Sequence, residues 1–153
     1  MDLFEIIKQK MELEDLDILN YSPLTLAYIG DCIYELVIRT IIVDEANRSV
    51  NKIHQAASSL VKAGTQSAMA DYLMDSFSDE ELAIYKRGRN SKVVTKAKNA
   101  SMKEYKAATG FEAVMGYLYL TNRSDRMMEL IKEGLNYVKS SSEEKKWDIT
   151  NIL

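Results

Sequence analysis

Residues 24–43 read LTLAYIGDCIYELVIRTIIV, a long apolar stretch that contains only three charged side chains, Asp31, Glu35 and Arg39. These charges are four residues apart, so on an α-helix they form one narrow polar stripe along an otherwise apolar rod. One interpretation is an ion-pair ladder along a solvent-exposed helix edge, in which Asp31 or Glu35 pairs with Arg39. The other is a carboxylate on a core helix that faces a metal ion.

Gly30 favours the metal interpretation. A glycine inside a helix costs about 1 kcal/mol relative to alanine, so a glycine beside Asp31 indicates that something approaches the helix backbone there. An ionised aspartate in apolar surroundings is also unfavourable unless a partner or a metal compensates its charge.

The composition restricts the kind of metal. The chain has one cysteine and one histidine, which excludes an internal disulfide, a cysteine-based zinc cluster and a histidine-rich site. Any metal must therefore be a hard ion with oxygen ligands, such as magnesium or manganese. We expect Cys32 to be a reduced, buried thiol and His54 to be a partly buried structural residue.

Length and composition predict an all-α fold. The 153 residues are 46% hydrophobic and 28% charged. They include only six glycines and one proline, too few turn-forming residues for a fold built of many strands. We expect one helical domain over residues 1–140 and a polar C-terminal tail over 141–153. The N-terminus has no apolar signal segment, and charges interrupt the 24–43 stretch, so a cytoplasmic protein is expected.

Helix start signals divide the chain further. Ser22 and Pro23 are a good N-cap and first residue for the central helix, Ser49 can cap a second long helix that Gly64 would bend or break, and Ser78 to Glu81 has the form of a capping box. The segment 93–101 is expected to be a loop. The other helices are expected over 2–10, from 100 to 120, and after a cap at Asn122 or Ser124.

Glu112 is a second lone acid in an apolar segment, ATGFEAVMGYLYL, and Gly116 follows it by four residues. Helical proteins build divalent metal sites from carboxylates that project inward from different helices. Asp31 and Glu112 are therefore the candidate metal ligands, and a metal so held would suit phosphodiester hydrolysis.

A basic segment lies just before Glu112. Residues 86–106 contain eight Lys and Arg and one acid, a charge of +7 that leaves −10 for the rest of the chain. A basic patch on an acidic body is typical of phosphate binding, although a solvated basic loop would have the same composition. The candidate residues for contacts with the phosphates of a nucleic acid are Arg87, Arg89, Lys92, Lys96 and Lys98.

LAYIGDCIYEL resembles the signature helix of the ribonuclease III family, and ATGFEAVMGYLYL resembles its second catalytic helix. The RGRNS stretch and the small size resemble one branch, Mini-ribonuclease III, which lacks the appended double-stranded-RNA-binding domain. The resemblance covers roughly residues 18–138. It differs from the full-length enzymes at Ala27 and Thr109, where those enzymes have further carboxylates, so the number of protein ligands for each metal stays open.

This resemblance implies an all-α endonuclease domain that forms a homodimer and cuts both strands of double-stranded RNA, leaving two-nucleotide 3′ overhangs. Asp31 and Glu112 would be catalytic and would bind magnesium, with manganese as a substitute and Glu35 as a nearby helper. The implied substrate is the ends of precursor 23S ribosomal RNA, which a ribosomal protein could present. An apolar surplus around Tyr28, Tyr34 and Ile38 is consistent with a dimer.

Two other classes of function fit the same sequence. A non-catalytic RNA-binding ribosome-assembly factor would keep the fold and the basic patch. A helical interaction module would use the acids only in structural ion pairs.

Overall fold

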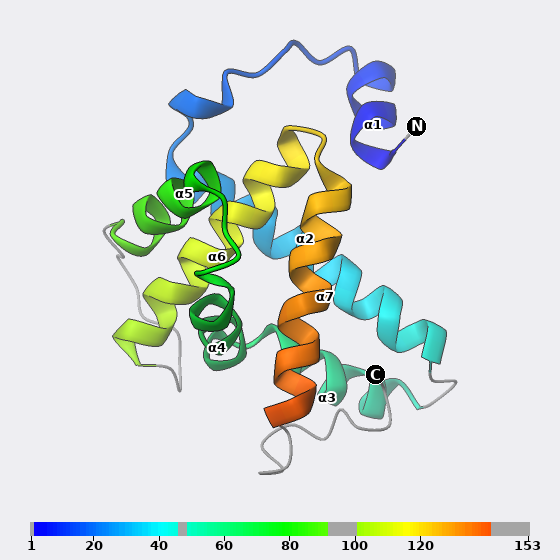
Figure 1. The fold of residues 1–153 in the computed structure, drawn as a ribbon. Helices are drawn as coiled ribbons and strands as arrows, with labels where there is room; N and C mark the ends of the chain where they lie inside the picture. Colours follow the sequence, from blue (N-terminus) through cyan, green and yellow to red (C-terminus); the bar gives the residue numbers. More distant parts are fainter. Residues whose placement is uncertain (1, 46–48, 92–100, 142–153) are drawn as a thin grey trace.

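Helix α6, Met102–Leu120, is the centre of the computed structural model, which describes residues 2–45, 49–91 and 101–141. Twelve of its residues are buried, and it packs against the helices α2, α4, α5 and α7 (Figure 1). The described residues contain no strand, so the predicted all-α class is confirmed. The elements are α1 (Leu3–Lys10), the 3-10 helix η1 (Ile18–Asn20), α2 (Pro23–Glu45), α3 (Val50–Val61), α4 (Ala63–Leu73), α5 (Asp79–Arg89), α6 and α7 (Ser124–Ser141).

The contact between α2 and α6 depends on two glycines. A Cβ atom on Gly30 would lie 1.7 Å from the backbone oxygen of Glu112, and one on Gly116 would lie 1.9 Å from the backbone oxygen of Leu26. No real Cβ atom tolerates such distances, so only glycine fits at either position. The close approach predicted at Gly30 is confirmed, and the backbone of α6 is what approaches.

Local capping sets most helix starts. The Ser22 hydroxyl accepts a hydrogen bond from the Leu24 amide, and Ser49 and Ser78 cap α3 and α5 as predicted. A second capping box, which the sequence reasoning missed, joins Ser101 and Glu104 at the start of α6. The final helix begins at Ser124, just after Asn122, whose φ of 59° lies in the left-handed region.

The long helix predicted over 50–77 is broken, as the sequence allowed at Gly64, but the break lies at Lys62 and the second part ends at Leu73. The chain ends α3 at Val61, passes through an extended Lys62 (φ −66°, ψ 155°) and begins α4 at Ala63. The last backbone carbonyl oxygens of α3 accept hydrogen bonds from side chains of other helices. Ser59 O accepts from Thr65 Oγ1 at 2.6 Å, Leu60 O from Tyr34 Oη at 2.9 Å, and Val61 O from Gln66 Nε2 at 2.8 Å.

Several predicted burials are wrong. Cys32 is free but exposed, and His54 is exposed. Tyr34 and Ile38 are fully buried, so neither contributes to a surface surplus, whereas Tyr28 is 82% exposed. Their positions on α2 explain this, because residues 34 and 38 share the face that packs on the core while 28 and 32 lie on the opposite face.

Two of the sequence predictions fall on parts of the chain that the structure does not describe. The predicted loop over 93–101 lies almost wholly outside the described residues, and so does the tail after Ser141. None of the described helices has the length and hydropathy needed to cross a lipid bilayer.

Candidate active site

The structure brings Asp31 of α2 and Glu112 of α6 together. Both line one pocket of about 480 Å³, and their carboxyl groups are hydrogen-bonded to each other. The close contact of the two helices at Gly30 and Gly116 makes this possible, because Gly30 directly precedes Asp31 and faces the backbone of Glu112. The other lining residues are Leu24, Ala27, Tyr28, Ile29, Cys32, Glu35, Tyr105 and Thr109.

The electrostatics of this pair are unfavourable without a cation. The pKa of the Glu112 carboxyl is raised to about 9, first by burial and then by the hydrogen bond and the negative charge of Asp31, while a hydrogen bond with Gln66 opposes the shift. Burial and the charge of Glu112 also raise the pKa of Tyr34. A carboxyl group whose pKa is raised beside a second carboxyl group is typical of a site whose charge is balanced by a bound ion.

The donor set fits a hard divalent cation. Asp31 and Glu112 supply carboxylate oxygens, and within the described ranges no cluster of three or more His, Cys, Asp or Glu side chains is arranged to hold a metal. Magnesium commonly binds through one or two carboxylates and fills its other positions with water and substrate phosphate oxygens. Two protein carboxylates in a solvent-reaching pocket are therefore sufficient for this ion.

The polar stripe on α2 divides between the two interpretations. Glu35 and Arg39 form the predicted ion pair at 3.5 Å, while Asp31 lies with Glu112 instead. Glu35 lines the same pocket as Asp31, so it is close to the candidate site although its charge is paired.

The positions that differ from full-length ribonuclease III line the same pocket. Ala27 and Thr109 are both 7% exposed. Thr109 uses its hydroxyl to donate to the backbone oxygen of Tyr105 at 3.0 Å. Neither residue therefore adds a carboxylate oxygen to the site.

A second glycine contact brings the described part of the basic segment close to the site. A Cβ atom on Gly88 in α5 would lie 2.8 Å from the Cα of Gly110 in α6, two residues before Glu112. Arg87 is exposed and donates to the backbone oxygen of Tyr21, and Arg89 lies 5.4 Å from the centre of the Tyr85 ring.

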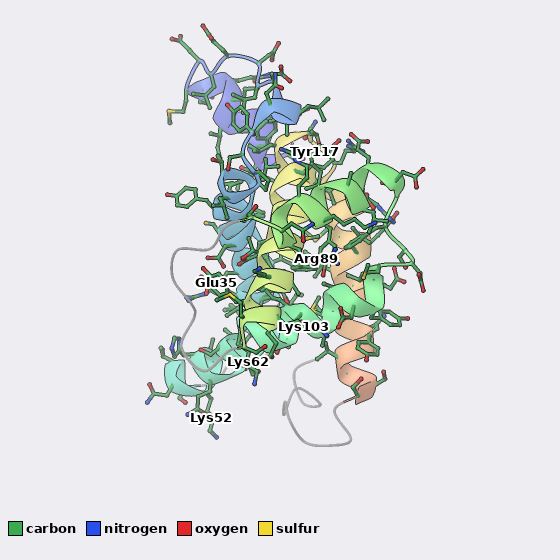
Figure 2. All side chains as sticks on the ribbon, turned by 90° about the vertical axis from the view of Figure 1, so that its left-hand side faces the viewer. Glu35, Lys52, Lys62, Arg89, Lys103 and Tyr117 are labelled. Carbon is green, nitrogen blue, oxygen red and sulfur yellow. The ribbon has the colours of Figure 1, made fainter. Side chains whose placement is uncertain are left out.

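Figure 2 labels Arg89, at the end of α5, and Lys103, at the start of α6. The remaining candidate RNA-binding residues, Lys92, Lys96 and Lys98, lie outside the described residues.

Sequence reasoning missed Gln66 and Tyr105. Gln66 is 2% exposed and interacts with Glu112 from α4. Its signal was a polar residue at helical spacing from Met69, Ala70 and Leu73, which are buried. Nothing in the sequence singled out Tyr105.

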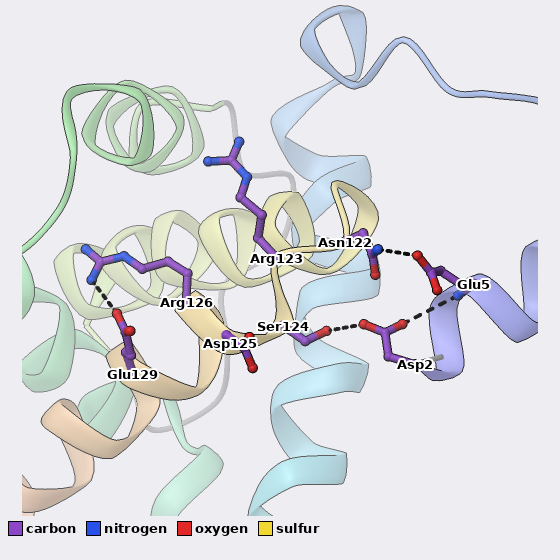
Figure 3. Close-up of a pocket in the computed structure, with 8 residues that line it drawn as sticks. All are labelled: Asp2, Glu5, Asn122, Arg123, Ser124, Asp125, Arg126 and Glu129. Atoms are coloured by element: carbon purple, nitrogen blue, oxygen red, sulfur yellow. Dashed lines mark hydrogen bonds and ion pairs between the residues drawn. The ribbon is translucent and has the colours of Figure 1, made fainter.

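A larger polar hollow of about 700 Å³ lies between α1 and α7 (Figure 3). Its polar groups are mostly occupied with one another: Ser124 donates to Asp2 at 2.9 Å, Asn122 donates to Glu5, and Arg126 pairs with Glu129 at 3.1 Å. The bonds of Asp2 and Glu5 attach α1 to the rest of the fold, while the Arg126–Glu129 pair lies within α7. The hollow has no arrangement that suggests chemistry.

Comparison with known proteins agrees with this site. The ribonuclease III domain family matches residues 24–123, a range that contains both carboxylates. Mini-ribonuclease 3 from Clostridium tetani is 44% identical over 83% of this chain and 85% of its own length. The enzymes of the same name from Staphylococcus aureus and Enterococcus faecalis are 42% and 40% identical, over 76% and 83% of this chain and 89% and 98% of their own lengths.

A solved structure also matches the fold. The crystal structure of a protein from Fusobacterium nucleatum superposes with a TM-score of 0.72 and 30% identity, covering 78% of this chain and 96% of that one. The chain therefore belongs to the Mini-ribonuclease 3 branch of the ribonuclease III family, a family of metal-dependent endoribonucleases that act on double-stranded RNA.

Proposed function

We propose that this chain is a cytoplasmic, magnesium-dependent endoribonuclease that cuts both strands of double-stranded RNA as a homodimer and matures the ends of precursor 23S ribosomal RNA. The observation that carries the proposal is the juxtaposition of Asp31 and Glu112 in one pocket that reaches solvent. The substrate is inferred from the branch to which the chain belongs, and a ribosomal protein that presents the RNA is part of the same inference.

Asp31 and Glu112 would hold the magnesium ion, with manganese as a substitute. A bound divalent cation supplies Lewis-acid stabilisation of the charge that develops on the scissile phosphate. The two carboxylates would fix the position of the cation, and Leu24, Ala27 and Ile29 add apolar side chains to the lining of the pocket. Glu35, which also lines the pocket, is paired with Arg39.

The basic segment is proposed to hold the RNA backbone. A-form RNA is recognised mainly through its phosphates and 2′-hydroxyls, and the Gly88–Gly110 contact keeps the end of α5 close to the turn of Glu112. Binding should therefore weaken steeply as salt is raised. The proposed contacts are Arg87, Arg89, Lys92, Lys96 and Lys98.

The homodimer is proposed to form through the exposed stripe of α2. Tyr28 is 82% exposed, Leu36 48% and Val43 62%, and Cys32 lies between the first two on the same face. Exposed apolar side chains grouped on one helix surface are typical of an interaction face, and here they lie beside the Glu35–Arg39 ion pair. Sedimentation at micromolar concentration should give a dimer for the wild type and a monomer for Tyr28→Arg, and a monomeric wild type would contradict the dimer.

The deciding experiment is incubation of the protein with a labelled RNA duplex and magnesium beside the Asp31→Asn variant. We expect staggered cuts on both strands with the wild type only, and products sized to one nucleotide should have 3′ overhangs. Duplex binding should survive in the variant. Binding without any cleavage by the wild type would instead favour the non-catalytic RNA-binding assembly factor.

A further inference from the structure

Gln66 in the first turn of α4 joins the end of α3 to the candidate site. Its side chain is almost fully buried, at 2% exposure, and Nε2 donates to the carbonyl oxygen of Val61 at 2.8 Å. A carbonyl oxygen only accepts hydrogen bonds, so the amide nitrogen must face Val61 and the orientation of the amide group is fixed.

The same side chain lies near enough to the Glu112 carboxyl group to act as its hydrogen-bond partner, which opposes the rise in the pKa of Glu112. Glu112 comes from α6, against which α4 packs directly. A glutamate side chain has several rotatable bonds, and a hydrogen bond from a rigid, buried partner restricts the directions in which its oxygens point. Gln66 is placed to impose that restriction from the side of α4.

A glutamine at this position carries a stability cost. Within the described part of the chain, Oε1 of Gln66 is buried and has no hydrogen-bond partner. A buried, unsatisfied amide oxygen lowers stability, and an apolar side chain of the same size would avoid that loss. A residue that breaks a local packing rule in this way is expected at a functional site.

We propose that Gln66 is a positioning residue, which orients the Glu112 carboxylate so that it and Asp31 present oxygens to the same cation. This inference rests on the proposed function, because it concerns the same site. It assigns no direct contact with RNA to Gln66. The effect should therefore fall on metal binding and on the chemical step, and not on the affinity for the duplex.

The test compares Gln66→Met with the wild type. Methionine keeps the length and approximate volume of glutamine but has no amide group. We expect the magnesium concentration that half-saturates the thermal shift of the RNA-free protein to rise by roughly tenfold, and kcat for duplex cleavage to fall by a similar factor. KM for the duplex should stay within twofold of the wild-type value.

Thr65→Val is the matched control. Thr65 is 0% exposed, is the neighbour of Gln66, and its hydroxyl donates to the Ser59 carbonyl at the same end of α3. Its loss removes an equally buried bond to the end of α3 that has no connection with Glu112. Magnesium binding and kcat of Thr65→Val should therefore stay within twofold of the wild-type values, whatever its melting temperature.

Two results would overturn the inference. One is a Gln66→Met variant whose metal midpoint and kcat are within twofold of the wild type, and the other is an equal loss in Thr65→Val, which would make the role purely structural. If Gln66→Met does not fold, Gln66→Asn provides the test, because it keeps a buried amide that is one methylene too short to reach both partners. A wild type that neither binds magnesium nor cleaves the duplex would overturn the proposed function itself.

Discussion

Helices α2 and α1 both pack against α6, but they are attached in opposite ways. The contact of α2 with α6 is a backbone-to-backbone approach at Gly30 and Gly116 that leaves no room for a single methyl group. Helix α1 has no buried residue; it is held by the Phe4–Tyr119 ring contact and by the hydrogen bonds that Ser124 and Asn122 donate to the carboxylates of Asp2 and Glu5 (Figure 3). The α2–α6 contact positions the carboxylates of Asp31 and Glu112, while the contacts of α1 lie away from them.

Among substitutions that test this difference between the two contacts, Gly30→Ala should have the largest effect on stability. The added methyl group would meet the backbone oxygen of Glu112 at 1.7 Å, and neither helix backbone can move aside without disturbing the core. We expect a loss of about 3 kcal/mol or more in the free energy of unfolding, measured by urea denaturation.

Gly64→Ala is the matched control for that substitution. Its added methyl group would meet only the flexible end of the Glu104 side chain, so a change within about 1 kcal/mol is expected. A Gly30→Ala protein as stable as the Gly64→Ala protein would show that the α2–α6 contact is not tight.

A smaller effect of opposite sign is expected for Glu112→Gln in the metal-free protein. The pKa of Glu112 is about 9 in the folded state and near 4.5 in the unfolded chain, so the folded state binds more protons and the wild type loses stability as pH rises between these values. The variant lacks this loss. Its melting temperature should match the wild type near pH 4 and exceed it increasingly toward pH 9, by about 2–4 °C for each kcal/mol.

Magnesium should remove that difference, because only the wild type gains stability from the ion. Glu35→Gln serves as the control, since Glu35 is half exposed and paired with Arg39, and it should change stability by less than about 1 kcal/mol at any of these pH values. A Glu112→Gln protein that is less stable than the wild type at pH 8 without metal would favour the purely structural ion-pair interpretation.

The smallest effect belongs to α1. Phe4 is half buried and meets Tyr119 edge to face, with ring centres 5.3 Å apart. Phe4→Ala should lower the free energy of unfolding by about 1 kcal/mol and leave the rate of duplex cleavage within twofold. Ile6→Ala on the same helix, where the side chain is 41% exposed, should change neither. A tenfold loss of cleavage in Phe4→Ala below its melting temperature would tie α1 to the site.

The parts of the fold that follow from local rules were predictable. The serines at 22, 49 and 78 signal helix starts through their own hydroxyl groups, and Gly30 signals a close backbone approach. Asp31 and Glu112 stood out because each is an isolated acid in an apolar helix. Their meeting in one pocket followed from the family resemblance and is now given by the packing of α2 on α6.

The errors in predicted helix ends and burial arose at positions where tertiary contacts, and not the local sequence, determine the structure. Gly64 marked the region of the break between α3 and α4, but not its place at Lys62, where the last carbonyls of α3 are satisfied by Tyr34, Thr65 and Gln66 from elsewhere in the fold. Helix α2 is apolar on nearly all sides, so its sequence did not reveal that Cys32 lies on the exposed face and Tyr34 on the buried one.

The capping box at Ser101 has a consequence for how this protein can diverge. Helix α6 begins by a signal contained in its own first turn, and α5 ends at Arg89 with a cap at Asn90. The register of Glu112 is therefore set from Ser101 onward and does not depend on the length or charge of residues 92–100. Changes in the length or charge of that segment should leave Asp31 and Glu112 in the same place relative to each other.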